Sequence, residues 1–94
     1  MELFDLGSIT ATPGALAALS GCGEVPTPYL ARHVSGDFGT VGDEDSGYNR
    51  RDIRDQCGRV LSAYDLPNGQ RLWIITNLTE EGQNDTCLLL PAEY

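Results

Sequence analysis

The sequence predicts an α+β fold, in which two or three short helices pack on a small antiparallel sheet. Three observations support this prediction. A Thr-Pro pair opens each of two apolar segments in the first third of the chain, an Asn-Gly pair separates two β-prone segments in the last third, and a third apolar segment follows them. Because the chain has 94 residues, we expect a single domain, residues 1–94, around one modest core.

The N-terminal segment predicts a short strand followed by a helix. β-Branched residues favour a strand over 8–11. Thr12 then has the side chain of a helix N-cap, and the proline after it fits the first helical position. The alanine- and leucine-rich run that follows predicts a helix over 13–20, with Leu16 and Leu19 facing the core.

The second Thr-Pro pair predicts a second helix over 28–34, with Thr27 as its N-cap and a glycine just after its end. The apolar stripe of this helix consists of Tyr29, Leu30 and Val34. Arg32 and His33 fall in its last turn, where cations interact favourably with the negative end of the helix dipole.

The middle of the chain is polar and rich in glycine. Residues 36–47 are expected to form an acidic loop that contacts the core through Phe38 and Val41. Residues 48–58 lack a strong apolar stripe and predict a partly exposed helix. Three side chains of that helix are candidates to point inward: Tyr48, Ile53 and Cys57.

The last third predicts a three-stranded antiparallel meander, which the short N-terminal strand accompanies in the sheet. Strands are expected over 59–65 and 70–77, since both segments are rich in β-branched and aromatic residues. The Asn-Gly pair between them is the strongest short signal for a hairpin. A third strand is expected over 86–90, where a proline ends it.

The charge composition is the most unusual property of the sequence. There are 14 acidic and six basic residues, which give a net charge of −8, and every basic residue is an arginine. Such a surface repels the phosphates of nucleic acid, but it attracts basic surfaces, including those that normally bind nucleic acid. The alternative is that the acids only keep the protein in solution.

The acids predict a partner-binding surface on loops and on the polar face of a helix. If the fold brings two acidic groups together, they form a negative patch that imitates a nucleic acid backbone. The expected partner is a basic nucleic-acid-binding protein, and no direct contact with nucleic acid is expected. The candidate contact residues are Asp37, Asp43, Glu44, Asp45, Asp52, Asp55, Glu80, Glu81 and Asp85.

The segment 32–39 suggests an alternative from another class of function, a small enzyme or ligand-binding domain. It gathers the only histidine, His33, with Ser35 and Asp37, the residue types of a general base, a nucleophile and an orienting acid. However, residues two apart on a helix point in different directions. The preferred interpretation is a helix end, in which Gly36 turns the chain into the loop, and no enzymatic activity is expected.

No cofactor and no metal ion are expected. A zinc site built from Cys22, Cys57, Cys87 and His33 is an alternative without local support, because no Cys-x-x-Cys pair occurs. The simpler interpretation is three reduced, mostly buried thiols. The acids of 36–47 lack the spacing of an EF-hand calcium loop, and the absence of lysine excludes a P-loop.

The sequence contains no apolar segment long enough to span a bilayer. Its first residues lack the basic and apolar regions of a secretion signal. We therefore expect no membrane contact and a cytoplasmic location, and we leave the oligomeric state open.

Four segments together resemble a known family: ATPGALAAL, YLARHVSGDFG, RVLSAYDLPNGQRLWIIT and LLLPAEY. They are similar, in the same order, to small proteins carried by plasmids, phages and other mobile elements, usually described as plasmid-related proteins. This chain has Phe38 where that family usually has tryptophan, and its acidic turn TEEGQND is particular to it. The resemblance implies a bacterial host and a mobile-element setting, in which small acidic proteins often inhibit host defence, as anti-restriction and anti-CRISPR proteins do.

Overall fold

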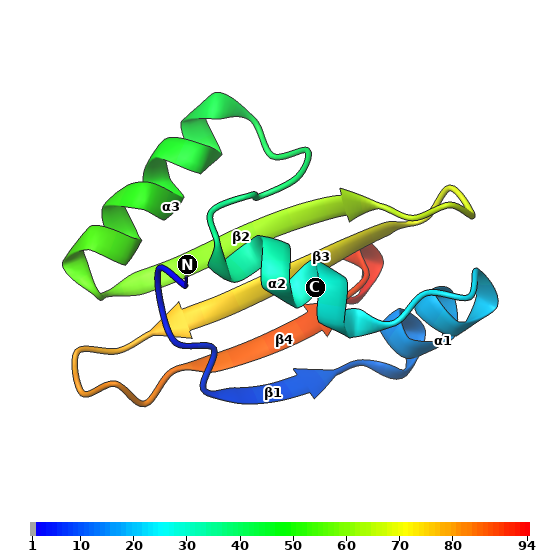
Figure 1. Cartoon of the computed structure of the whole chain (residues 1–94), viewed down its shortest axis with the longest axis horizontal. Helices are drawn as coiled ribbons and strands as arrows, with labels where there is room; N and C mark the ends of the chain where they lie inside the picture. The colour runs from blue at the N-terminus through cyan, green and yellow to red at the C-terminus, as the bar shows by residue number, and fades with distance from the viewer. Residues whose placement is uncertain (1) are drawn as a thin grey trace.

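The computed structural model describes residues 2–94. Three α-helices pack against a four-stranded sheet (Figure 1), so the architecture is α+β, as predicted. The elements are, in chain order, β1 (Ser8–Ala11), α1 (Pro13–Gly21), α2 (Pro26–Val34), α3 (Asp43–Asp55), β2 (Gly58–Asp65), β3 (Arg71–Leu78), β4 (Asp85–Leu89) and a short 3₁₀ helix, η1 (Pro91–Glu93). Within residues 2–94, none of the helices combines the length and the apolar character that crossing a membrane requires.

The sheet is mixed, and the prediction of a wholly antiparallel sheet is wrong. Its strand order is β1-β4-β3-β2, and the meander β2-β3-β4 is antiparallel as expected. β1 pairs with β4 in parallel, with Ser8 opposite Asp85 and Ala11 opposite Leu88. Parallel neighbours need a long connection, which the helices and the meander provide. The residue pattern of a strand of only four residues carries no information about its direction.

The meander strands lie close to their predicted positions. β2 and β3 form a hairpin whose turn contains Asn68 and Gly69, and Gly69 adopts a positive φ of 84° that suits glycine. β4 begins and ends one residue earlier than predicted. The helix η1 was not predicted.

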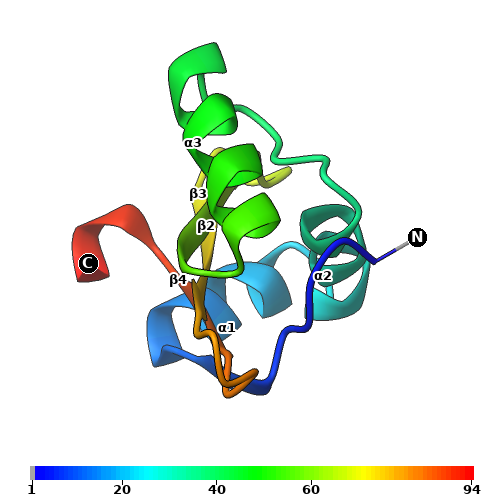
Figure 2. The ribbon, with the colours of Figure 1, turned by 90° about the vertical axis from the view of Figure 1, so that its left-hand side faces the viewer.

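One face of the sheet carries the core. Figure 2 shows the strands nearly end-on, with α2 and the N-terminal segment on one side and the C-terminal segment on the other. The first core cluster joins α1 and α2 to the strands through Ala15, Ala18, Leu19, Tyr29, Tyr64, Leu66, Leu72, Ile74 and Leu88. The second consists of Phe4, Val34, Phe38, Val60 and Leu78. Val41 packs against the second cluster, so both predicted anchors of the loop, Phe38 and Val41, are confirmed.

The helix α1 forms where its cap and its alanines predict it. Thr12 is the N-cap, and its hydroxyl accepts a hydrogen bond from the backbone N–H of Ala15 at 3.1 Å. Leu19 is buried as expected, but Leu16 is 49% exposed, so its predicted inward orientation is wrong. The buried side of the helix consists of Ala15, Ala18 and Leu19, and Leu16 lies on the exposed flank of this side.

The helix α2 starts two residues earlier than predicted. Its first residue is Pro26 and its N-cap is Val25, which makes no side-chain cap bond, whereas Thr27 lies inside the helix. The fixed φ of Pro26 suits the first helical position and is sufficient to begin the turn. Tyr29 and Val34 are buried and Leu30 is half-buried, so the predicted apolar stripe is confirmed.

The helix α3 begins at Asp43, inside the segment predicted to be a loop. Its first turn contains three acids, which are favourable at the positive end of the helix dipole: Asp43, Glu44 and Asp45. The helix ends at Asp55, and the C-cap residue Gln56 adopts the left-handed conformation with a φ of 53°. The loop is therefore confined to residues 36–42.

The inner face of α3 differs in part from the prediction. Ile53 is half-buried against the second core cluster, as expected. Tyr48 is 47% exposed and Cys57 is exposed, so their predicted inward orientations are wrong. Asn49, which is only 3% exposed, is the buried side chain of this helix, because its amide bonds to the edge of β2.

Candidate functional site

The only histidine is at the centre of a buried polar network. The Nδ1 atom of His33 lies 2.5 Å from the hydroxyl of Ser62, and its Nε2 atom lies 2.9 Å from that of Thr76. Thr76 contacts the hydroxyl of Thr86 at 2.7 Å, and Thr86 donates to the carbonyl oxygen of Leu6 at 2.7 Å. The network therefore links α2 to β2, β3 and β4.

The burial of His33 determines its charge. Its side chain has no exposed surface, and burial lowers its pKa from 6.5 to about 4. At neutral pH the ring is uncharged, and the expectation of a cationic His33 at the helix end is wrong. Each ring nitrogen already has a hydroxyl partner, so the network satisfies the buried polar groups and joins the helix to the sheet.

The side chains of His33, Ser35 and Asp37 do not converge. The hydroxyl of Ser35 donates to the carbonyl oxygen of Arg32 at 3.0 Å. Asp37 pairs with Arg32 at 2.7 Å and also accepts a hydrogen bond from the backbone N–H of Gly39. These contacts are those of a helix end that enters a turn, and they give the three residues no common point at which a substrate could bind.

The nine candidate acids fall into three groups, and the first group is paired with arginine. Asp37, Asp52 and Asp55 lie within 4 Å of Arg32, Arg51 and Arg54, respectively. Asp52 also accepts a hydrogen bond from the backbone N–H of Arg59 at the start of β2. The negative charge of these three acids is therefore largely compensated within the protein.

The second group occupies the first turn of α3. Asp43, Glu44 and Asp45 are all exposed, and none of them forms an ion pair within residues 2–94. Glu44 accepts a hydrogen bond from the hydroxyl of Tyr48 at 3.1 Å. This group keeps its negative charge and faces solvent.

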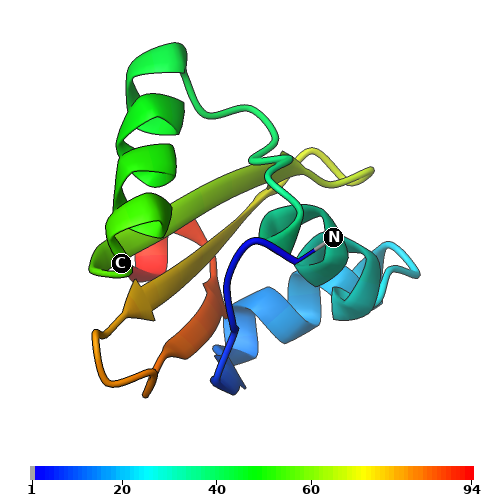
Figure 3. The same cartoon turned by 60° about the vertical axis from the view of Figure 1, so that its left-hand side comes forward.

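The third group lies at the turn between β3 and β4. Glu80, Glu81 and Asp85 are exposed, and Asp85 accepts a hydrogen bond from the side chain of Asn77 at 2.9 Å. Figures 1, 2 and 3 all place this turn at the bottom of the molecule and the first turn of α3 at the top. The second and third acidic groups therefore lie at opposite ends of the molecule.

The six arginines are confined to one part of the chain. All of them fall within residues 32–71, and the seven acids of that segment nearly balance their charge. The other seven acids lie in segments 1–31 and 72–94, which contain no arginine. Those two segments contain β1, α1 and β4, and seven of the eight net negative charges lie in them. The position of each arginine along the chain was a visible signal of this asymmetry, which the total charge conceals.

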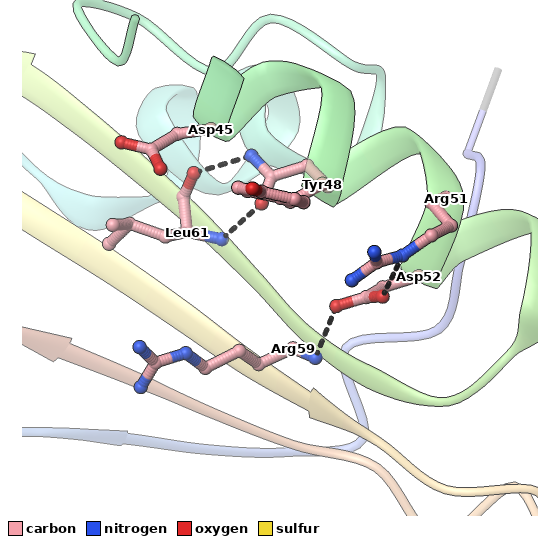
Figure 4. A pocket seen from close by; sticks show the side chains of 7 residues that line it. Asp45, Tyr48, Arg51, Asp52, Arg59 and Leu61 are labelled. Carbon is pink, nitrogen blue, oxygen red and sulfur yellow. Dashed lines mark hydrogen bonds and ion pairs between the residues drawn. The ribbon is translucent and has the colours of Figure 1, made fainter.

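An open pocket lies between α3 and β2 (Figure 4), and no sequence pattern predicted it. It has a volume of 290 Å³ and is lined by Asp45, Tyr48, Asn49, Arg51, Asp52, Arg59 and Leu61. Asn49 exchanges two hydrogen bonds with the backbone of Leu61, and Asp52 bonds to both Arg51 and Arg59. Asn49 and Asp52 are therefore engaged in holding α3 to β2, while Asp45 lines the pocket without an ion pair among the described residues.

The three thiols do not form a common site. Cys57 is exposed, while Cys22 and Cys87 are half-buried, and all three are free. Cys22 donates to a backbone carbonyl oxygen of its own helix, that of Ala18, at 3.3 Å. Among the side chains of residues 2–94, no group of three or more His, Cys, Asp or Glu is arranged to hold a metal ion.

Comparisons of this chain with protein-family models, with curated proteins and with solved structures gave no match.

Proposed function

We propose that this protein is an acidic interaction module that binds a basic, nucleic-acid-binding surface of another protein and thereby blocks access of nucleic acid. In the mobile-element setting that the family resemblance implies, the partner is a host defence complex of the restriction or CRISPR type. The protein acts by occupying a surface, without chemical turnover.

The observation that carries this proposal is the segregation of charge. Four of the six arginines pair with an acid near them in the sequence or on a neighbouring strand, and among residues 2–94 no ion pair involves an acid of 2–31 or 72–94. A field of one sign accelerates association with a surface of the opposite sign, and added salt weakens that association. If the acids served only solubility, an even distribution over the surface would be sufficient.

The test begins with a complex captured from a bacterial host by the tagged full chain at low salt. Binding of that complex to its nucleic acid is then measured by fluorescence anisotropy at increasing concentrations of this protein. We expect competitive displacement that weakens steeply as the salt concentration rises. Unchanged nucleic acid binding at saturating protein would overturn the proposal.

Charge variants identify the contact group. We expect Glu80→Gln with Glu81→Gln, or Asp43→Asn with Glu44→Gln and Asp45→Asn, to weaken inhibition by about tenfold in at least one of the two sets. The matched control is Asp55→Asn, because Asp55 already pairs with Arg54, and its effect should stay below about twofold. Thermal unfolding of each variant separates lost binding from lost stability. Full inhibition by both sets at high salt would contradict charge mimicry.

A further inference from the structure

One edge of the sheet, the outer side of β2, is closed. The side-chain amide of Asn49 donates to the carbonyl oxygen of Leu61 at 2.7 Å and accepts from its N–H at 3.0 Å. Two residues further along, the N–H of Ala63 donates to Phe38 and its carbonyl oxygen accepts from Thr40. The backbone N–H of Arg59 is bonded to Asp52. A further strand could not pair with this edge without displacing those groups.

The other edge, the outer side of β1, is open. The backbone N–H groups of Ser8 and Thr12 bond to the β4 segment, and in a parallel ladder the intervening residue Thr10 does the same. Ile9 and Ala11 therefore direct their N–H and C=O groups away from the sheet. Within residues 2–94, no hydrogen bond reaches these four groups. The edge also lacks the lysine, proline or bulge that commonly protects such a strand.

The two faces of β1 at this edge differ in chemistry. Ile9, which is 50% exposed, lies on the core side beside Thr86, and Ala11 lies beside Leu88. Ser8 and Thr10 lie on the other side, where Ser8 is next to the carboxylate-bearing Asp85 in the register. A strand added here therefore meets apolar side chains on one face and hydroxyl and carboxylate groups on the other.

The surroundings of β1 are acidic. Asp5 lies just before the strand. Its backbone carbonyl oxygen accepts a hydrogen bond at 2.8 Å from the side chain of Asn84, which lies in the turn between β3 and β4. The same turn carries Glu80 and Glu81, and Asp85 is the first residue of β4. The segments that build this side of the molecule, 2–31 and 72–94, contain no basic residue. A basic strand is therefore complementary to this edge, and a second copy of the chain could bring no basic residue from these segments.

We propose that the open β1 edge binds an extended segment of a basic partner, which adds to the sheet as a further strand with alternating apolar and basic side chains. This inference rests on the proposed function and specifies how the partner is held. Backbone hydrogen bonds to Ile9 and Ala11 fix the segment, its apolar side chains cover Ile9, and its basic side chains face Asp85 and the neighbouring turn.

The test uses a fluorescein-labelled peptide of alternating lysine and valine, titrated with the full chain at low salt and followed by anisotropy. Ile9→Pro removes the outward N–H and keeps the bonds between β1 and β4, since proline is tolerated where the N–H of an edge strand faces solvent. We expect Ile9→Pro to weaken binding by about tenfold and the matched control Ile9→Val by less than about twofold. Amide NMR shifts of the wild type on peptide addition should be largest at Ile9 and Ala11.

A second peptide keeps the test independent of the folding of Ile9→Pro. In it, alternate backbone nitrogens are methylated, so that it retains the charge but loses the donors that a strand needs. We expect it to bind the wild type about tenfold more weakly than the parent peptide. Equal binding of the two peptides, no binding of either, or a dimer that forms through β1 and excludes the peptide would each overturn strand addition.

A third peptide, with glutamate in place of lysine, separates this inference from the proposed function. If the lysine peptide binds better than the glutamate peptide but methylation has no effect, strand addition is wrong and the preference for a basic partner stands. If the glutamate peptide binds equally well, the preference for a basic partner is wrong, and the proposed function fails with it. A strong preference for lysine together with a strong effect of methylation supports both.

Discussion

The two edges of the sheet contrast sharply. The edge at β2 is satisfied by Asn49, Asp52 and the loop residues beside Gly39, whereas at the β1 edge no group of residues 2–94 bonds to the backbone of Ile9 and Ala11. The closed edge also lies in the part of the chain that contains every arginine, whereas the open edge lies in a segment with acids and no basic residue. The backbone groups that stabilise the fold and the backbone groups that are available to a partner therefore lie at opposite edges of one small sheet.

The largest expected effect is at the loop that closes the β2 edge. Gly39 has a φ of 72°, and a Cβ atom there would meet the carbonyl oxygen of Ala63 far inside contact distance. We expect Gly39→Ala to lower the free energy of unfolding by about 4 kcal/mol, because the backbone must move and the closure is lost. Urea unfolding monitored by Trp73 fluorescence measures this loss of unfolding free energy.

The matched control for this substitution is Gly69→Ala. Gly69 also has a positive φ, of 84°, but a Cβ atom there would meet nothing within 4 Å. Its cost should be limited to the backbone strain of about 1 kcal/mol. If the two variants lose the same stability, the contact between Gly39 and Ala63 does not close the edge.

The next largest loss of stability is expected on protonation of His33, whose hydrogen-bond network connects β2 to Leu6, just before β1. The pKa of His33 is about 4 in the folded protein and 6.5 when unperturbed, so the unfolded chain binds a proton first as the pH falls. Stability from this group is complete above pH 6.5 and decreases towards pH 4, by about 3 kcal/mol in total. Urea unfolding at a series of pH values follows the decrease.

Carboxylates titrate over part of the same pH range, so the comparison is made against His33→Gln. Glutamine can both donate and accept, but it does not titrate, and the carboxylates remain the same in both proteins. The difference in unfolding free energy between the two proteins should change by about 1.4 kcal/mol per pH unit where the His33 effect is fully developed. A difference that stays constant from pH 7 to pH 4.5 would show that His33 is not held neutral by burial.

A third prediction opens the closed edge directly. Asn49→Ala leaves the N–H and the carbonyl oxygen of Leu61 without partners, and we expect a loss of about 2 kcal/mol. Asn49→Asp keeps an acceptor for the N–H of Leu61 but places a carboxylate against its carbonyl oxygen, so it should also destabilise. Asn77→Ala, at an exposed position, is the control. Hydrogen exchange of the Leu61 amide should accelerate in Asn49→Ala and stay slow in Asn77→Ala.

Local signals in the sequence predicted much of the fold. Thr12 and the alanines after it define α1, and the Asn-Gly pair defines the hairpin between β2 and β3. These signals succeed because caps and tight turns depend on neighbouring residues. The apolar inside-facing side chains of α2, Tyr29 and Val34, were also predictable, since the apolar residues of this helix recur at helical spacing.

Long-range contacts explain what the sequence did not predict. His33 is buried because its partners Ser62 and Thr76 lie 29 and 43 residues away. Asn49 is buried because it replaces a neighbouring strand at Leu61, 12 residues further on. β1 pairs with a strand at the far end of the chain. The asymmetric charge was visible in the sequence, but only the sheet order shows which edge it surrounds.

The smallest expected effect is at Asp37, which lies next to the loop of the closed edge. The pKa of Asp37 is lowered mainly by the hydrogen bond from Arg32. The pair therefore stabilises the folded protein at pH values above 3.8, the unperturbed pKa, and this stability is lost as the pH falls through the lowered pKa. The Arg32 and Asp37 side chains are 46% and 53% exposed, and solvent screens the pair. Asp37→Asn should therefore cost less than about 0.5 kcal/mol at pH 7, and high salt should remove the difference from wild type. A larger, salt-independent loss would mean that more than the screened ion pair with Arg32 is lost. Asp37→Ala, which also removes the acceptor for the Gly39 N–H, measures the share of that hydrogen bond.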